Sequence, residues 1–163
     1  METFSADRIW RSIARALAES PLCAWATVTG SRQPHINTAY FAYSEDLDLY
    51  FLSHPSSTHC RNVSANPSMA VAVFASTQSW TSPGLGLQLF GRCEPATGMH
   101  SEAAERLYGL RFPAHAAWKD TLKPGETAFA YRFYRFVPEM IKILDEAEFG
   151  DAVWLALRLD SPP

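Results

Sequence analysis

The sequence has few cysteines, and none of them forms a C-x-x-C pair. Cys23, Cys60 and Cys93 are an odd number of thiols at wide spacings. This pattern argues against a disulfide framework and is typical of a protein in a reducing compartment. We therefore expect a cytoplasmic protein.

The sequence also has no excess of charge of one sign and no long apolar segment. Its 14 Lys and Arg residues against 17 Asp and Glu residues give a net charge of −3, which disfavours a nucleic-acid partner. The longest apolar run, Met69–Ala75, is far shorter than the ~20 residues of a membrane-spanning helix. The first residues, Met1–Asp7, contain an early acid and no apolar h-region, so we predict neither a signal peptide nor a membrane association.

What is present indicates one globular domain. The chain has 163 residues, of which 47% are hydrophobic and 13% aromatic, enough to build a core without disulfides or metals. Only 19% of the residues are charged, which leaves room for a buried subunit interface. We expect a single domain over residues 1–163, with an N-terminal helix in 1–20, the main fold in 21–146 and a C-terminal tail in 147–163.

Turn residues divide most of the chain into short strands. Residues 5–19 have the period of an amphipathic helix with Ser5 as N-cap. Further helices are predicted over 59–65, 98–110 and 114–122, and strands over 23–29, 35–43, 47–53, 69–75, 85–94, 127–137 and 140–144. We expect strand 69–75 to be buried on both faces, strand 85–94 to bend at Gly91, and the apolar stretch 152–159 to be either strand or helix. Six or seven strands in antiparallel succession predict a mainly β, α+β fold built on a closed or nearly closed barrel.

One strand runs directly into a helix whose first turn is rich in hydroxyl groups. The segment Ser53-His54-Pro55-Ser56-Ser57-Thr58-His59-Cys60-Arg61 combines these hydroxyls with a fixed positive charge at Arg61. The first amides of a helix lack intrahelical partners and favour an anion, so this chemistry suits a phosphate. An ordinary N-cap with one surplus serine explains the same residues.

Four segments, taken in order, resemble the pyridoxamine-phosphate-oxidase-like family of flavin-binding split barrels. They are Leu49–Val63, Asn66-Pro67 before Met69–Phe74, Gly86–Gly91 and Tyr134–Asp145. The resemblance covers roughly residues 20–146, and the N-terminal helix and Arg111-Phe112-Pro113 are most similar to an uncharacterised bacterial subgroup. It implies a six-stranded antiparallel split β-barrel with flanking helices, which forms a homodimer with flavin mononucleotide (FMN) at the subunit interface.

The resemblance also implies which residues contact the cofactor. The phosphate would be held at the strand-to-helix segment, and the flavin ring would lie along the preceding strand. The implied cofactor-binding residues are Asn37, Thr38, Ala39, Tyr40, Ser53, Ser57, Thr58, His59, Arg61 and Gln88. His59 stands where the family commonly has Lys, and Thr58 where some members have Arg. A neutral His is a weaker phosphate partner than a permanent cation, so a different ligand stays open. Asn37, Thr38 and Gln88 are equally explained as solvent-facing strand residues.

Other chemistry is less well supported by the residues. His54, His59 and Cys60 do not complete a zinc-ligand set. His100 and His115 are isolated in the sequence, as is His35, although His35 begins the strand implied to line the ligand. No catalytic residues are identified.

The resemblance implies a flavin-dependent oxidoreductase that acts on an unknown small molecule. Authentic pyridoxamine-phosphate oxidases carry a basic, His-containing motif after the last strand, whereas this chain has the acidic stretch Asp145–Asp151. We therefore expect a phosphorylated substrate to be repelled. The alternative is a non-catalytic ligand-binding split barrel that holds haem, holds a deazaflavin or is empty.

Overall fold

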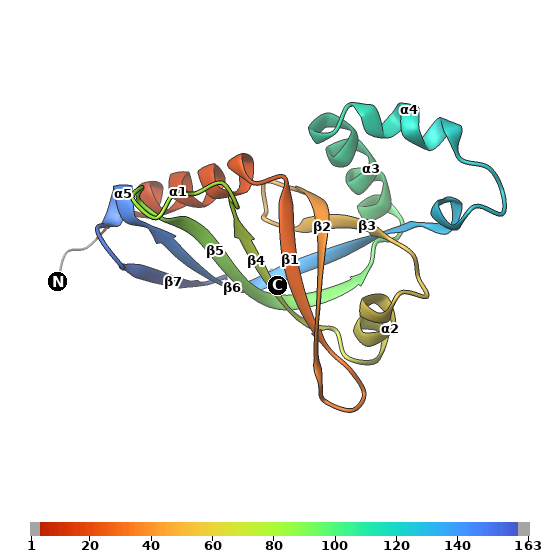
Figure 1. Cartoon of the computed structure of the whole chain (residues 1–163), viewed down its shortest axis with the longest axis horizontal. Coiled ribbons are helices and arrows are strands. Elements are labelled where there is room, and N and C mark those ends of the chain that lie inside the picture. Colours follow the sequence, from red (N-terminus) through yellow and green to blue (C-terminus); the bar gives the residue numbers. More distant parts are fainter. Residues whose placement is uncertain (1–3, 160–163) are drawn as a thin grey trace.

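The computed structural model describes residues 4–159 and contains one seven-stranded antiparallel sheet (Figure 1). The strands follow the order β3-β2-β1-β4-β5-β6-β7, and an additional pairing of β3 with β6 closes the first six into a barrel. The strands are β1 (Leu22–Val28), β2 (Pro34–Tyr43), β3 (Leu49–Ser53), β4 (Ser68–Phe74), β5 (Leu85–Pro95), β6 (Arg132–Asp145) and β7 (Trp154–Arg158). The helices are α1 (Ala6–Glu19), α2 (Thr58–Ala65), α3 (Met99–Arg111), α4 (Ala114–Thr121), the 3₁₀ turn η1 (Thr127–Ala130) and α5 (Glu146–Phe149). The six-stranded split barrel with flanking helices is confirmed.

The barrel interior is filled by alternate residues of each strand. In β1 the buried residues are Cys23, Trp25 and Thr27, as the two-residue period of a strand requires. Their cross-strand partners on β4 and β5 continue the same layer, because Trp25 pairs with Val71 and Val71 with Leu89. Apolar burial of this kind supplies most of the driving force for folding.

The prediction that strand 69–75 is buried on both faces is wrong. The inward residues of β4 are buried, but Ala70 and Ala72 on the outer face are only half-buried, and Phe74 is 53% exposed. The outer face of β4 continues into those of β1 and β5, where the outward residues are likewise half-buried or exposed.

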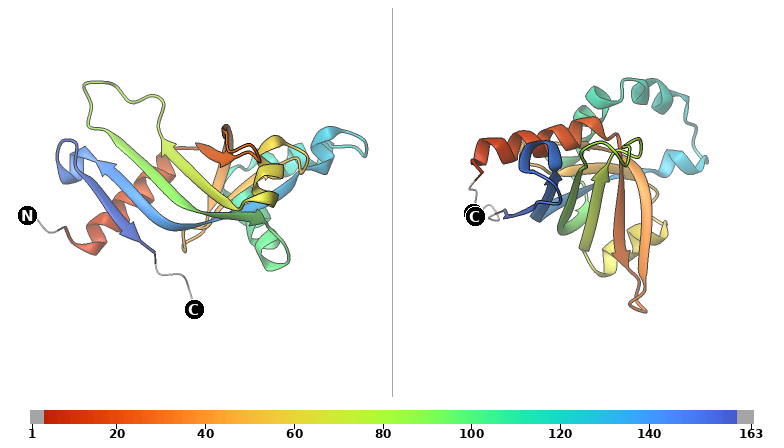
Figure 2. Two further views of the ribbon diagram at one scale, coloured as in Figure 1. Left: turned by 90° about the horizontal axis from the view of Figure 1, so that it is seen from below. Right: turned by 60° about the vertical axis from the view of Figure 1, so that its left-hand side comes forward.

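Helices cover two other parts of the barrel, at opposite ends of its long axis (Figures 1 and 2). Helix α1 begins after Ser5, whose hydroxyl accepts the Arg8 amide at 3.4 Å, and it buries Ile13 and Leu17 completely. Helix α3 packs on the outside of β2, β3 and β6, where Ala42, Tyr50, Ala104, Tyr108 and Phe133 form a second apolar cluster. Helix α3 therefore covers part of the outer face, whereas the buried residues of α1 join the core inside the barrel.

Gly91 marks an irregularity between β5 and β6. The register shifts between Phe90 and Gly91, which confirms the predicted bend. A Cβ atom at Gly91 would lie 2.0 Å from the carbonyl oxygen of Val137, so no larger residue fits at this crossing.

Three predicted elements need correction or completion near the C-terminus. Residues 127–130 form a 3₁₀ turn rather than a strand, and β6 runs without interruption through Pro138. The apolar tail, predicted as strand or helix, contains the strand β7; residues 160–163 lie outside the described part. Among the described helices, none is long and apolar enough to cross a membrane.

Candidate cofactor site

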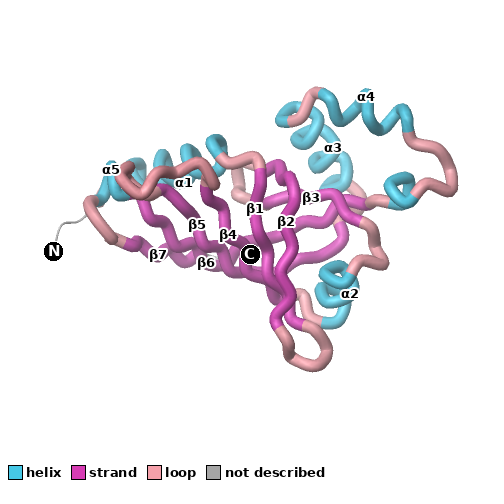
Figure 3. The backbone as a smooth tube through the Cα atoms, viewed as in Figure 1, coloured by secondary structure: helices cyan, strands magenta, loops and turns pink. Residues whose placement is uncertain are grey.

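The junction of β3 with α2 brings together Ser53, Ser57 and His59. Ser53 ends β3, and Ser57 caps α2 by accepting the Cys60 amide at 3.4 Å. Both hydroxyls meet the imidazole, because His59 Nε2 lies 2.7 Å from Ser53 Oγ and 3.0 Å from Ser57 Oγ. Figure 3 shows this loop and α2 beside the β1–β2 hairpin. The order strand, loop, helix was sufficient to predict that these residues lie together.

His59 lies under aromatic rings and points inward. It is 8% exposed, and its ring centroid is 6.2 Å from that of Trp25 and 6.5 Å from that of Phe51. The His35 ring stacks on it nearly parallel at 6.2 Å. Burial lowers the pKa of His59, and the neighbouring His35 lowers it further, so the imidazole is neutral at pH 7.

Thr58 and Arg61 lie on the exposed side of the same turn. Arg61 donates to the carbonyl oxygen of Ser56, and its Nη2 lies 3.5 Å from Thr58 Oγ1. Arg61 is exposed, so its guanidinium can turn toward a ligand at the start of α2. A permanent cation, a hydroxyl and the first amides of a helix are donors that suit a phosphate.

The four predicted residues of β2 divide between the two faces of the strand. Asn37 and Ala39 are half-buried on the inner side, and Asn37 pairs with Trp25 of β1. Thr38 and Tyr40 point outward and are exposed, with 54% of Tyr40 accessible. All four therefore belong to the barrel wall, with two on each face.

Within a single chain, Gln88 does not lie near the cluster of Ser53, Ser57 and His59. It lies on the open outer face of β5, in a cross-strand row that runs from Thr38 through Ala24 and Ala72 to Gln88. Three strand spacings separate Thr38 from Gln88, roughly 14 Å.

No group of three or more metal-ligating side chains occurs among residues 4–159. His54 instead accepts the Ser56 amide at 3.1 Å and pairs with the Ser56 hydroxyl at 2.7 Å, while Cys60 is buried in the core. The described residues thus give the zinc alternative no geometric support.

Sequence reasoning missed a cavity of about 410 Å³ outside the barrel, between β2, β3 and the helices α3 and α4. Its lining includes His115, which the sequence analysis left as an isolated residue, and Trp118. Their spacing of three residues on one short helix was the available signal. Pro113 separates these two residues from Tyr108 on α3, so the sequence did not indicate that the aromatic residues of the two helices lie together.

Comparison with known proteins agrees with this geometry. The sequence profile described as pyridoxamine 5'-phosphate oxidase matches residues 9–144. The chain belongs to this family. No curated protein matches the sequence.

Solved structures of the pyridoxamine 5'-phosphate oxidase family and similar barrels share the fold. A haem-binding protein from Mycobacterium smegmatis is 18% identical with a TM-score of 0.71, over 97% of this chain and 60% of that one. A putative pyridoxamine 5'-phosphate oxidase from Listeria innocua is 23% identical, with a TM-score of 0.62 over 83% and 98% of the chains. An FAD-binding protein from Mesorhizobium loti is 22% identical, with a TM-score of 0.62 over 86% and 94%. At these identities the likeness concerns the fold alone.

Proposed function

We propose that this chain binds FMN at the β3–α2 junction and acts as a flavin-dependent oxidoreductase on a small molecule. The observation that supports this most directly is the donor set at that junction. Thr58 Oγ1, the Arg61 guanidinium and the first amides of α2 face one exposed turn, directly after a strand that carries Ser53. This set fits a phosphate monoester even though His59 is neutral.

In this proposal the residues of the chain bind and orient the cofactor. Arg61 and Thr58 hold the phosphate, while Ser53 and Ser57 fix His59 and keep the loop in place. Ala39 and Tyr40 border the flavin ring. Bound FMN supplies hydride transfer, which agrees with a site that has no acid–base constellation of its own.

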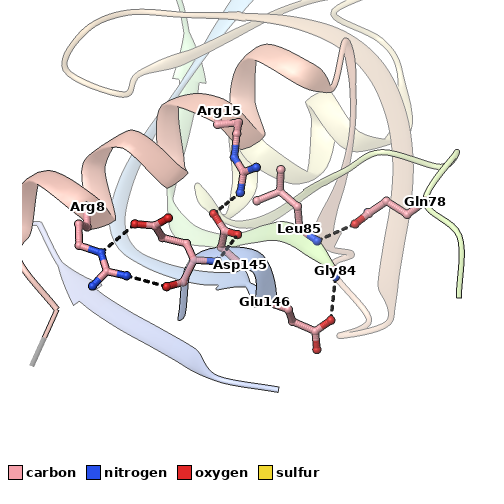
Figure 4. Close-up of polar contacts among 8 residues, drawn as sticks. Arg8, Arg15, Gln78, Gly84, Leu85, Asp145 and Glu146 are labelled. Atoms are coloured by element: carbon pink, nitrogen blue, oxygen red, sulfur yellow. Dashed lines mark hydrogen bonds and ion pairs between the residues drawn. The ribbon is translucent and has the colours of Figure 1, made fainter. Parts of the chain in front are cut away.

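The acidic stretch after β6 has a structural role in the described chain. Asp145 pairs with Arg15 at 2.5 Å, Glu148 with Arg8 at 2.8 Å, and Glu146 accepts the Gly84 amide at 2.7 Å (Figure 4). Asp145 and Glu148 fasten α1 at the end of the molecule opposite to α2, and Glu146 fastens the loop before β5 (Figure 1). Repulsion of a phosphorylated substrate therefore does not follow from them, and the absence of a basic motif is the argument against pyridoxamine 5'-phosphate that remains.

A homodimer is part of the proposal, because the open outer face needs a cover. Ile36 is 70% exposed, Phe74 53% and Leu22 46%, and the small residues Ala24 and Ala72 keep the face between them flat. Exposed apolar area of this kind is typical of a subunit interface. Gln88 lies on this face, so a second copy seated here would carry its own Gln88 toward the site.

Haem is the second candidate ligand, and His35 is the residue that supports it. His35 is only half-buried and stacks on His59, so its imidazole can serve as an axial ligand. His59 is less suited to that role because its Nε2 is already paired with two serines.

The experiment that tests the proposal is the visible absorption spectrum of freshly purified, untagged protein, followed by mass spectrometry of the released ligand. We expect the two-band flavin spectrum and the mass of FMN. A Soret band would support haem, and the mass of a deazaflavin would name that cofactor instead. A colourless protein that takes up no added FMN would contradict the proposal.

A further inference from the structure

The cavity outside the barrel has an aromatic wall. It has a volume of about 410 Å³ and lies between β2, β3 and the helices α3 and α4. Small-molecule sites typically have volumes of roughly 300–1,000 Å³. Its lining is Ala39, Tyr40, Leu52, Tyr108, Phe112, Ala114, His115, Trp118 and Tyr131. Five of these nine residues carry a phenyl, phenol or indole ring, and none is Asp, Glu, Lys or Arg.

The inner part of this aromatic pocket is buried, and its rim is accessible. Tyr108 and His115 are 7% and 8% exposed, and their rings meet edge to face at 4.9 Å. At the rim, Tyr40 packs edge to face on Phe112 at 5.4 Å but stays 54% exposed, and Trp118 is 38% exposed. Rings held in this way offer stacking surfaces to a planar ligand.

The pocket is also electrically neutral at pH 7. Burial lowers the pKa of His115, the nearby Lys119 lowers it further, and Glu105 opposes both. Glu105 Oε1 lies 3.9 Å from His115 Nδ1 but is paired with Lys119 Nζ at 2.8 Å. Both charged residues line the adjoining cavity of about 510 Å³ rather than this one. An anionic ligand would therefore lose its hydration without gaining a charged partner in the lining of this pocket.

The position of the pocket connects it with the cofactor site. Ala39 and Tyr40 line the pocket and border the proposed flavin ring, and Leu52 directly precedes Ser53. β2 and β3 are both paired on their two sides within the barrel, so the pocket offers no free strand edge for a peptide. A small molecule is the occupant that this geometry favours.

We propose that the aromatic pocket binds an uncharged, planar aromatic molecule. Its neutral aromatic wall, its volume and its accessible rim support this ligand class. The further statement that this molecule is the substrate rests on the proposed flavin function, whereas binding itself does not.

The test compares two probes of nearly the same shape and different charge, by isothermal titration calorimetry on the protein as purified. We expect 2-naphthalenemethanol to bind with one site per chain. We expect the affinity for 2-naphthoate to be lower by a factor of about ten or more. Ala114→Trp fills the pocket from the exposed first residue of α4 and is expected to abolish binding. Ala117→Trp, on the exposed side of the same helix and outside the lining, is the matched control and is expected to bind as wild type does.

Three results would overturn the inference. Equal affinity for the two probes contradicts selection for an uncharged ligand, and unchanged binding by Ala114→Trp contradicts the location. No binding of either probe contradicts the pocket as a ligand site, including the case in which a second copy of the chain fills it. The flavin content of each preparation is measured in parallel, so that probe binding without flavin counts against the flavin function alone.

Discussion

Arg15 Nη2 of α1 lies 2.5 Å from Asp145 Oδ2 at the end of β6 (Figure 4), and this carboxylate is 1% exposed. The same Asp145 side chain caps α5 by accepting the Glu148 amide at 3.2 Å. One buried carboxylate thus holds an N-terminal helix and a C-terminal turn on the barrel. The ion pair also raises the pKa of Arg15.

Removing this arginine is expected to destabilise the fold. Arg15→Ala leaves Asp145 buried without its cation, and because Arg15 itself is 44% exposed, we expect a loss of about 1–2 kcal/mol in the free energy of unfolding. Urea denaturation measures it. Arg11→Ala, on the exposed side of the same helix, is the control and should change the free energy of unfolding little. Equal losses for the two variants would show that the ion pair with Asp145 does not itself stabilise the fold.

Because β5 approaches β6 closely at Gly91, we expect that adding one methyl group at this position strongly destabilises the fold. Gly91→Ala forces Cβ into the Val137 carbonyl, so we expect a loss of about 3 kcal/mol or more, or a failure to fold. Gly109→Ala is the matched control, because Gly109 lies within α3 with nothing near its Cβ position. This control should gain about 0.5–1 kcal/mol from helix propensity. A Gly91→Ala protein as stable as wild type would refute the packing described here.

The two buried neutral histidines predict that stability falls as the pH is lowered from about 7 to 5. In the folded chain the pKa of His59 and that of His115 lie below the ordinary value of 6.5, so the unfolded chain binds more protons in this range. Urea midpoints at several pH values above 5 measure the slope. This pH range lies above the acid range in which Glu146, whose pKa is lowered, becomes protonated and loses its contribution to stability.

Replacing both histidines separates their contribution from that of other groups. We expect His59→Gln combined with His115→Gln to flatten the stability profile between pH 5 and 7. His54→Gln, in the exposed loop before α2, is the control and should keep the wild-type slope. A slope that survives the double substitution would assign the effect to other residues.

Arg61 is expected to carry the charge-assisted contact to the cofactor phosphate. Arg61→Ala should weaken FMN binding by about 1.5–3 kcal/mol, the contribution of a hydrogen bond to a charged group. Flavin fluorescence titration of the apoprotein measures it, with Arg11→Ala on the exposed side of α1 as control. Unchanged affinity in Arg61→Ala would remove this residue from the site.

The open outer face predicts the oligomeric state. We expect a dimer by light scattering coupled to gel filtration, and a monomer after Ala72→Arg, because the charge would stand at the centre of the apolar row. Ala18→Arg on the exposed side of α1 should leave the mass unchanged. A monomeric wild-type protein would contradict the dimer.

Much of the candidate site at the β3–α2 junction could be predicted from the sequence because it is local. Ser53, Ser57 and His59 lie within seven consecutive residues, and a strand that enters a helix through a short loop leaves few ways to arrange them. The inward direction of His59 was not predictable, because Trp25 and His35, which receive it, come from strands far away in sequence. The resemblance implied that Gln88 contacts the cofactor, but Gln88 lies across the sheet from the cluster, since its place depends on which strands pair.

The sequence by itself determined the elements whose causes are local. Ser5 starts α1, alternation of Cys23, Trp25 and Thr27 defines the inner face of β1, and Gly91 bends β5. Tertiary structure alone decided the barrel closure between β3 and β6, the pairing of Arg15 with Asp145, and the aromatic pocket between Tyr40 and Trp118. Each of these joins residues about 80 to 130 positions apart, and such contacts depend on the simultaneous packing of the whole chain rather than on any local preference.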